Sequence, residues 1–291
     1  MRQEQATDGF RLAYDREGRG QGAPAVVLLH GWPGDRTDYR DVVPFLAEAA
    51  DVVVPDLRGF GESDKHTDGP ASQYGGAAQA RGVAGLIAEL GLERPVLAGY
   101  DIGSRITQAI ARDRPGLPSA LILSPPLPGI GGRILGPRAQ REFWYQAFHN
   151  LGLATELIDG KPDAVRAYLR HFWSHWSGSG YDLAERDLDH LVSVYGPPGA
   201  FTASIAWYRA GAGSVAVSAA ERTPSPGDRI QVPTTGLWPD QDPLFPVEWS
   251  DQIDDFFADA TLTRLDGTGH FTPLESPREF AAAVLAALPA G

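Results

Sequence analysis

Short apolar runs punctuate the first half of the chain, and stretches of mixed polarity separate them. The runs lack the alternation of a strand with one wet face, which is typical of strands covered on both faces in a parallel sheet. These apolar runs lie at 24–30, 51–55, 96–99 and 121–123. Helix-compatible segments between and after them occupy 39–49, 79–90 and 105–112. The alternation predicts an α/β fold built on a mostly parallel, doubly wound sheet.

The pattern changes after the last of these runs. A stretch rich in proline and glycine, 125–132, leads into a long segment, 138–210, with the pattern of helices dense in aromatic residues. No strand-like run interrupts that segment, so we interpret it as a helical cap inserted between sheet elements. Strand-like runs resume at 232–238 and 260–265, before a C-terminal helix at 278–288.

These segments predict two domains. We expect a core domain formed by residues 1–130 and 226–291, with residues 131–225 forming the cap. Phe10 to Tyr14 alternates apolar and polar positions, and we expect it to be an edge strand.

Composition and charge exclude several classes of function. Of the 291 residues, 43% are hydrophobic and 21% charged, which allows a large core. A net charge of −12 argues against nucleic acid and anionic membranes as partners. The absence of cysteine excludes disulfides and thiolate metal sites, and no apolar run approaches the ~20 residues that span a bilayer. Met1 to Gly9 lacks the apolar region of a signal peptide, so we expect a cytoplasmic protein.

The stretch Gly99-Tyr100-Asp101-Ile102-Gly103 indicates the chemistry. An apolar run ends in Gly-x-Asp-x-Gly and passes directly into a helix-compatible segment, which is the pattern of a nucleophile elbow. The glycines fit because the turn is strained and flanking side chains would collide with backbone. The usual elbow carries serine, but no serine here has glycine both two residues before and two residues after it. The nucleophile hypothesis therefore rests on one carboxylate, that of Asp101.

Two stretches downstream offer partners for that carboxylate. His270 lies in a glycine-rich loop after a predicted strand, and Asp240 and Asp242 follow the end of another. All lie at the carboxyl ends of strands, where sites in open α/β sheets form. The order Asp101, Asp242, His270 is the nucleophile, acid, histidine order of α/β-hydrolases.

Together these motifs resemble the epoxide hydrolase and haloalkane or haloacetate dehalogenase group of α/β-hydrolases, in which aspartate replaces serine. The resemblance covers almost the whole chain and rests on these stretches: His30-Gly31-Trp32-Pro33, Asp56-Leu57-Arg58-Gly59-Phe60-Gly61, the Asp101 elbow, Asp242-Pro243, Gly269-His270 and the cap. It implies an α/β-hydrolase fold with an inserted helical cap, and it favours Asp242 over Asp240 as the acid.

The resemblance also implies a mechanism. An ionised Asp101 attacks an sp³ carbon and forms an alkyl ester, and His270, oriented by Asp242, activates the water that hydrolyses the ester. Backbone N–H groups of Trp32 and Ile102 are expected to form the oxyanion hole.

The cap is expected to decide between epoxide and halide. Related epoxide hydrolases usually donate a proton to the epoxide oxygen from two cap tyrosines, and the segment around Tyr208 resembles the one that carries the second. An alanine stands where the first is usual, so we expect Trp144 to pair with Tyr208, with Tyr145 in reserve. His149 and Trp173 are further candidates for a cap donor or for lining the pocket.

Epoxide hydrolysis to a vicinal diol is therefore the predicted function, and two alternatives stay open. A dehalogenase uses the same nucleophile: residues 208–212 resemble the haloacetate group, and Arg105 matches one of its two substrate-binding arginines. Ile102 opposes that function, because it stands where the other arginine, or the tryptophan of haloalkane dehalogenases, would be. The second alternative is a non-catalytic ligand receptor on a hydrolase fold, which the intact set of three residues opposes.

The expected ligands follow from these hypotheses. We expect no cofactor and no metal, since His171 and His175 share a helix face without an obvious third ligand. The partners are a small apolar or aromatic organic substrate and water. We expect a monomer or a homodimer.

Overall fold

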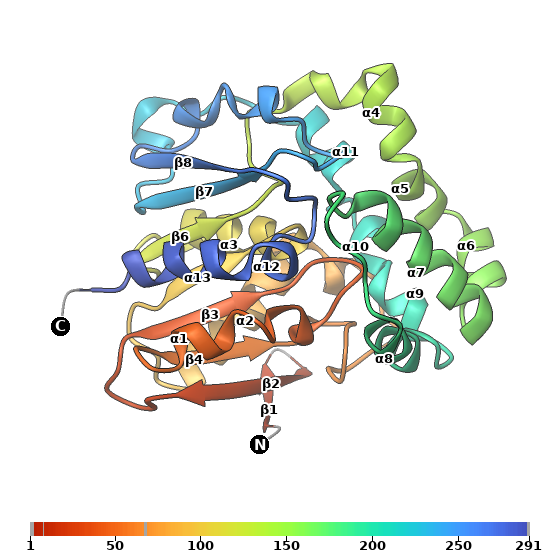
Figure 1. Ribbon diagram of the computed structural model, residues 1–291, viewed down its shortest axis with the longest axis horizontal. Coiled ribbons are helices and arrows are strands. Elements are labelled where there is room, and N and C mark those ends of the chain that lie inside the picture. The colour runs from red at the N-terminus through yellow and green to blue at the C-terminus, as the bar shows by residue number, and fades with distance from the viewer. Residues whose placement is uncertain (1–2, 8, 67–68, 290–291) are drawn as a thin grey trace.

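One sheet organises the part of the chain that the structure describes, and its eight strands run in the spatial order β1-β2-β4-β3-β5-β6-β7-β8 (Figure 1). The computed structural model describes residues 3–7, 9–66 and 69–289. Residues 1–2 and 8 of the N-terminal stretch that lacks a signal-peptide pattern, and both ends of the predicted core domain, lie outside these ranges. The strands are β1 (Gln3–Thr7), β2 (Phe10–Gly18), β3 (Ala25–Leu29), β4 (Asp51–Pro55), β5 (Val96–Gly99), β6 (Ala120–Leu123), β7 (Thr234–Pro239) and β8 (Ala260–Leu265).

Within the part of the sheet ordered β4-β3-β5-β6-β7-β8, each strand is parallel to the next, in agreement with the predicted mostly parallel sheet. Strands β3, β4, β5 and β6 are buried along their whole length, which explains why none of them alternates. The expectation that residues 10–14 form an edge strand is wrong. Strand β2 lies between β1 and β4 and is antiparallel to both, so the edge is β1.

Helices cover both faces of the sheet, which confirms the doubly wound α/β prediction (Figure 1). Helix α2 packs against α3, and α1 packs against α13. The helices of the core are α1 (Val43–Leu46), α2 (Gly76–Glu89), α3 (Ile102–Asp113), α12 (Thr272–Glu275) and α13 (Pro277–Ala286). Short 3₁₀ helices are η1 (Arg36–Tyr39), η2 (Ala71–Tyr74), η3 (Gly131–Leu135), η4 (Pro226–Asp228), η5 (Val247–Ser250) and η6 (Ile253–Asp255). Within the described ranges, no helix is long and apolar enough to cross a membrane.

The segment between β6 and β7 is helical and lies to one side of the sheet, at the right of Figure 1. Its helices are α4 (Pro137–Glu142), α5 (Trp144–His149), α6 (Gly152–Ile158), α7 (Pro162–Trp176), α8 (Glu185–Tyr195), α9 (Ala200–Ser204), α10 (Ala206–Arg209) and α11 (Ser214–Ala219). Most of its aromatic side chains are buried, so they hold these short helices to one another and to the core. We refer to this helical segment as the cap.

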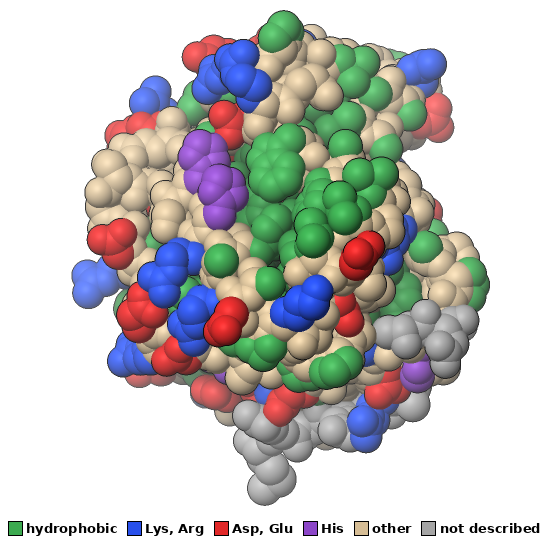
Figure 2. All heavy atoms as spheres, turned by 90° about the vertical axis from the view of Figure 1, so that its right-hand side faces the viewer, with side chains coloured by type: hydrophobic (Ala, Val, Ile, Leu, Met, Phe, Trp, Pro, Cys, Tyr) green, Lys and Arg blue, Asp and Glu red, His purple; other side chains and the backbone are tan. Residues whose placement is uncertain are grey.

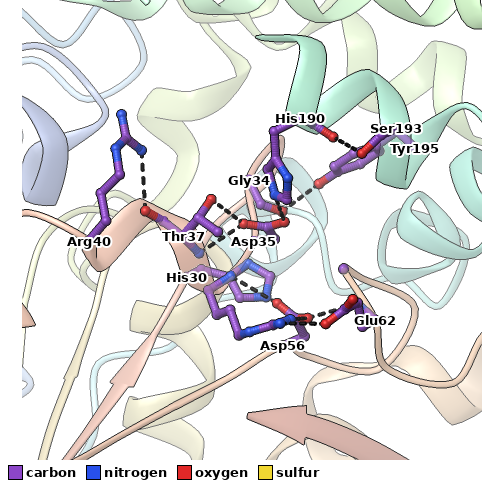
Figure 3. Close-up of polar contacts among 12 residues, drawn as sticks. His30, Gly34, Asp35, Thr37, Arg40, Asp56, Glu62, His190, Ser193 and Tyr195 are labelled. Carbon is purple, nitrogen blue, oxygen red and sulfur yellow. Dashed lines mark hydrogen bonds and ion pairs between the residues drawn. The ribbon is translucent and has the colours of Figure 1, made fainter. Parts of the chain in front are cut away.

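Helix α8 of the cap is tied to the loop that follows β3 (Figure 3). Nε2 of His190 lies 2.6 Å from a carboxylate oxygen of the buried Asp35, and the Tyr195 hydroxyl donates to the Gly34 carbonyl at 2.7 Å. This loop also carries Trp32, so the contacts fix the cap directly above the end of β3.

Candidate active site

The backbone at Asp101 has the strained turn that the Gly-x-Asp-x-Gly pattern predicts. Asp101 has φ +47° and ψ −120°, a backbone conformation that residues other than glycine rarely adopt. A Cβ on Gly99 would lie 2.5 Å from the Gly103 carbonyl carbon, and one on Gly103 would lie 2.0 Å from the Leu29 carbonyl oxygen. Both flanking positions therefore need glycine, and the turn lifts the Asp101 side chain to the N-terminus of α3.

Two backbone N–H groups hold the Asp101 carboxylate. The Trp32 N–H donates to Oδ2 at 2.8 Å, and the Ile102 N–H donates to the same carboxylate. Burial raises the pKa of Asp101, while the nearby His270 and the two N–H donors act in the opposite direction. The structure thus brings together Asp101, Trp32 and Ile102 as expected from the sequence.

The position of the Trp32 N–H depends on His30, one residue before the turn. Nε2 of His30 accepts from the Leu57 N–H at 3.0 Å, so its proton resides on Nδ1, 2.9 Å from the Gly31 carbonyl. A Cβ on Gly31 would lie 2.7 Å from the Asp101 Cβ, so this glycine allows the loop to approach the elbow closely.

His270 and Asp242 form a buried pair beside the elbow. Nδ1 of His270 lies 2.8 Å from Oδ2 of Asp242, whose Oδ1 accepts from the Leu244 N–H at 2.8 Å. A carboxylate only accepts, so the His270 proton resides on Nδ1 and the lone pair on Nε2. That Nε2 lies 3.9 Å from Oδ1 of Asp101 and has no hydrogen-bond partner in the described part of the chain.

Burial opposes the charged form of His270, but the charges of Asp242 and Asp101 outweigh it and raise the pKa of the imidazole. Asp240, the other candidate acid, points elsewhere: it accepts from the Gly267 N–H at 2.7 Å and pairs with Arg264 at the surface. Geometry thus joins Asp242, and not Asp240, to His270.

Tyr145 and Tyr208 of the cap lie over the loop that holds Asp101. Both are buried, and the ring of Tyr145 stacks on Trp32 with centroids 5.6 Å apart, while Tyr208 meets the same indole edge-on at 6.0 Å. Their own rings meet edge-on, with centroids 5.6 Å apart. Burial raises the pKa of each phenol well above its usual value, and the negative charge of Asp101 adds to the effect.

Trp144, expected beside Tyr208, lies on the outer face of α5. Its side chain is 42% exposed and its indole stacks on Phe172. Figure 2 shows hydrophobic side chains gathered on this face of the molecule, and the large exposed ones that the cap contributes are Leu135, Trp144, Leu151, Leu153 and Leu157. The structure therefore does not bring Trp144 to Asp101, whereas the reserve candidate Tyr145 points inward.

The two remaining cap candidates occupy different environments. His149 is buried against Trp32 and Tyr208, with ring centroids at 4.9 and 4.7 Å, so it lines the aromatic wall of the site. Its Nε2 lies 2.9 Å from the Tyr168 hydroxyl, and burial lowers its pKa well below the usual value. The indole N–H of Trp173 donates to the Pro33 carbonyl at 3.1 Å, so Trp173 joins cap to core and is not free to donate to a ligand.

Gln146 is a site residue that sequence reasoning missed. It is buried and its Nε2 donates to the Tyr145 hydroxyl at 3.1 Å. A glutamine beside an aromatic residue on a short helix carries no recognisable signal, because its inward direction depends on how the cap helices pack.

The assembled groups can perform nucleophilic substitution followed by hydrolysis. A buried carboxylate with two N–H donors faces the free nitrogen of a histidine that is paired with a second carboxylate, and two phenols cover them. Groups of these types, in this arrangement, are what a nucleophile, a base with its orienting acid, an oxyanion hole and proton donors require.

Comparisons with known proteins agree with this architecture. Residues 26–283 match the alpha/beta hydrolase family model. The soluble epoxide hydrolase of Corynebacterium sp. (strain C12) is 28% identical over 279 residues, which cover 93% of this chain and 91% of that protein. The fluoroacetate dehalogenase of Burkholderia sp. is 29% identical over 196 residues, covering 66% and 64%.

Solved structures give the same picture. The structure of the epoxide hydrolase CorEH superposes with a TM-score of 0.85 at 26% identity, covering 98% of this chain and 97% of that one. With the family match extending over most of the sheet and the whole cap, the chain belongs to the α/β hydrolase family, as an epoxide hydrolase-like member.

Proposed function

We propose that the protein hydrolyses an epoxide to a vicinal diol through an ester on Asp101. The observation that carries the proposal is the placement of two buried phenols, Tyr145 and Tyr208, over the loop whose backbone N–H holds the Asp101 carboxylate. An epoxide oxygen needs a proton as the ring opens, and a phenol beside the nucleophile can supply it.

In the first step the Asp101 carboxylate attacks one epoxide carbon. The carbon–oxygen bond of the ring breaks, and the oxygen takes a proton from the tyrosine pair, leaving a tyrosinate and an alkyl ester. We assign the first donor to Tyr145 in place of Trp144, because Tyr145 is buried beside Trp32 while Trp144 is on the surface. Tyr208 keeps the role expected from the sequence.

In the second step His270 removes a proton from water, which attacks the Asp101 carbonyl carbon. The 3.9 Å between Nε2 of His270 and Oδ1 of Asp101 suits a water molecule that bridges the two atoms. The N–H groups of Trp32 and Ile102 stabilise the oxyanion. Collapse releases the diol, whose second oxygen takes the proton from His270, and the proton of the regenerated acid restores the tyrosine.

The test is a panel of aryl and alkyl epoxides alongside haloalkanes and haloacetates, with diol and halide release followed together. On the active substrate, His270→Gln should stop turnover while attack continues, so intact-mass measurement should find the protein heavier by one substrate. An unmodified variant protein would remove the ester from the mechanism.

One observation keeps a dehalogenase as second candidate: the chain resembles a fluoroacetate dehalogenase over 196 residues. Two features oppose this function. A guanidinium nitrogen of Arg105, the candidate substrate-binding arginine, already donates to the Ser218 hydroxyl at 3.1 Å. The residue after Asp101 is Ile102, where the second arginine would stand. Halide release without diol formation in the panel would favour this function. Binding without turnover of any substrate would favour a receptor.

A further inference from the structure

Gln146 is held in one orientation behind the tyrosine pair. Its Oε1 accepts from the Val215 N–H at 3.0 Å, at the start of α11. Since an N–H must face the oxygen of the amide, the nitrogen end faces Tyr145, to whose hydroxyl it donates at 3.1 Å. The amide is therefore clamped by backbone on one side and serves one phenol on the other.

The close approach of Gly213 completes the clamp. A Cβ at this position would lie 2.6 Å from Oε1 of Gln146 and 3.0 Å from Cδ1 of Tyr208. The turn between α10 and α11 thus lies against both the glutamine and the second tyrosine, so three cap helices, α5, α10 and α11, fix one hydrogen-bonded group.

Counting protons in this group shows what Gln146 does. The Tyr145 oxygen has one proton and two lone pairs, and Gln146 donates to one of the lone pairs. The ring of Tyr208 lies edge-on beside that of Tyr145, with centroids 5.6 Å apart. Because the amide donates to the Tyr145 oxygen, the phenolic proton of Tyr145 is not used in that bond and is left for the site. A donor on the Tyr145 oxygen stabilises its anion, and no such donor to Tyr208 is found among the described residues, so Tyr145 is the stronger acid.

We propose that Gln146 is a positioning residue that makes Tyr145 the proton donor of the pair and directs its proton to the epoxide oxygen. The proposal rests on the proposed function and adds the interaction that makes Tyr145 a stronger acid than Tyr208. The side chain of Gln146 bonds to Tyr145 and Val215, and not to Asp101 or His270, so we expect it to act on ring opening alone and to leave hydrolysis of the ester unchanged.

The first experiment needs no substrate. A fluorinated tyrosine placed at position 145 brings the phenol pKa into an accessible range, and ¹⁹F NMR follows its titration in the full-length protein. Gln146→Leu should raise that pKa by about one pH unit, because the tyrosinate loses a hydrogen bond to a charged acceptor. Gln140→Leu is the matched control, since the Gln140 side chain donates to the Ile134 carbonyl in the same cap and should leave the titration unchanged.

The second experiment is a double-mutant cycle on the rate of ester formation in single turnover. Gln146→Leu should slow ester formation about tenfold in the wild-type background and have no further effect in Tyr145→Phe. Ester hydrolysis should keep its rate in every variant. Equal slowing in both backgrounds, slowed hydrolysis or an unchanged titration would overturn the proposal.

Failure of the proposed function has a separate signature. Wild-type protein that opens no epoxide would refute epoxide hydrolysis, and the role of Gln146 in ring opening with it. The titration would then still decide whether Gln146 governs the Tyr145 proton.

Discussion

The two halves of the site are built by different means. The core half consists of Asp101, Asp242 and His270, which stand on loops at the ends of parallel strands, where backbone N–H groups and close-approaching glycines fix them. The cap half consists of Tyr145 and Tyr208 on short helices, where a clamped side chain, Gln146, fixes them.

This difference separates general chemistry from specificity. A buried carboxylate, a histidine and an oxyanion hole would serve epoxides and halides equally, because both reactions form and hydrolyse an ester on the aspartate. Only the epoxide requires a proton during attack. Variants in the core half should therefore stop the reaction on every substrate, while variants in the cap half should slow epoxide opening selectively.

The largest effect is expected for Asp101→Asn. Asparagine tolerates the positive φ of this turn, so the fold should persist while the nucleophile is lost. Turnover should fall about 10⁴-fold or more, as measured by diol release, with intact mass confirming that the amide survives. Turnover close to wild type would contradict covalent catalysis.

Asp242→Asn should lower turnover about 10³- to 10⁴-fold, since the amide no longer fixes the tautomer of His270 or stabilises its imidazolium. Asp240→Asn is the matched control: it carries the same chemical change just two residues away, at the surface. Comparable losses in both would show that Asp242 has no special role.

Tyr145→Phe should slow ring opening about 10²-fold by removing a general acid. Trp144→Phe, at the neighbouring exposed position, should leave the rate within twofold or so, as surface substitutions usually do. Stopped-flow measurement of ester formation distinguishes the two. The opposite ranking would restore the sequence-based pairing of Trp144 with Tyr208.

The acidic limb of the pH profile should reflect His270. Burial alone would lower its pKa, but Asp242 and Asp101 raise it above the usual value of about 6.5. Because the base must be neutral, ester hydrolysis should decline as the pH falls through this raised pKa. Asp242→Asn should move the limb to lower pH, and an unmoved limb would mean that another group titrates.

The smallest effect, on stability, is expected for the contact between His190 of the cap and Asp35 of the core. The hydrogen bond between His190 and Asp35 raises the pKa of His190. Burial alone would raise the pKa of Asp35, but the bond to His190 outweighs burial and lowers that pKa to about 2. The protonated His190 stabilises the fold below its unfolded pKa of about 6.5, and this stabilisation is lost as the pH rises through its folded pKa. The ionised Asp35 stabilises the fold above its unfolded pKa of about 3.8, and this stabilisation is lost as the pH falls towards about 2.

Between about pH 3.8 and about pH 6.5, His190→Gln should thus lower the free energy of unfolding by about 1 kcal/mol or less, since the histidine is partly exposed. Its difference from wild type should shrink at alkaline pH. Urea unfolding at two pH values measures it, and a difference that grew with pH would contradict the assigned directions.

Sequence patterns predict the core half far better than the cap half. The glycines around Asp101 are local necessities of one turn, and uniformly apolar strands can only be buried, so both leave a signal in the sequence. Trp144 and Tyr145 are adjacent aromatic residues on one short helix, about 100° apart around its axis. Which of them faces inward depends on tertiary packing, which the pattern does not contain.

The same reason explains the edge strand. Residues 10–14 alternate as a half-buried strand should, but pairing with β1 depends on a polar segment, Gln3–Thr7, that lacks an apolar pattern.

The central claim, attack by Asp101 on an epoxide carbon, is tested most directly by a single turnover in ¹⁸O-water with enzyme in excess of the epoxide that the panel selects. Peptide mass spectrometry then locates the label. The ester route predicts ¹⁸O in the Asp101 carboxylate and an unlabelled diol, because the new diol oxygen comes from the protein. A labelled diol with unlabelled Asp101 would mean direct attack by water and would contradict the account.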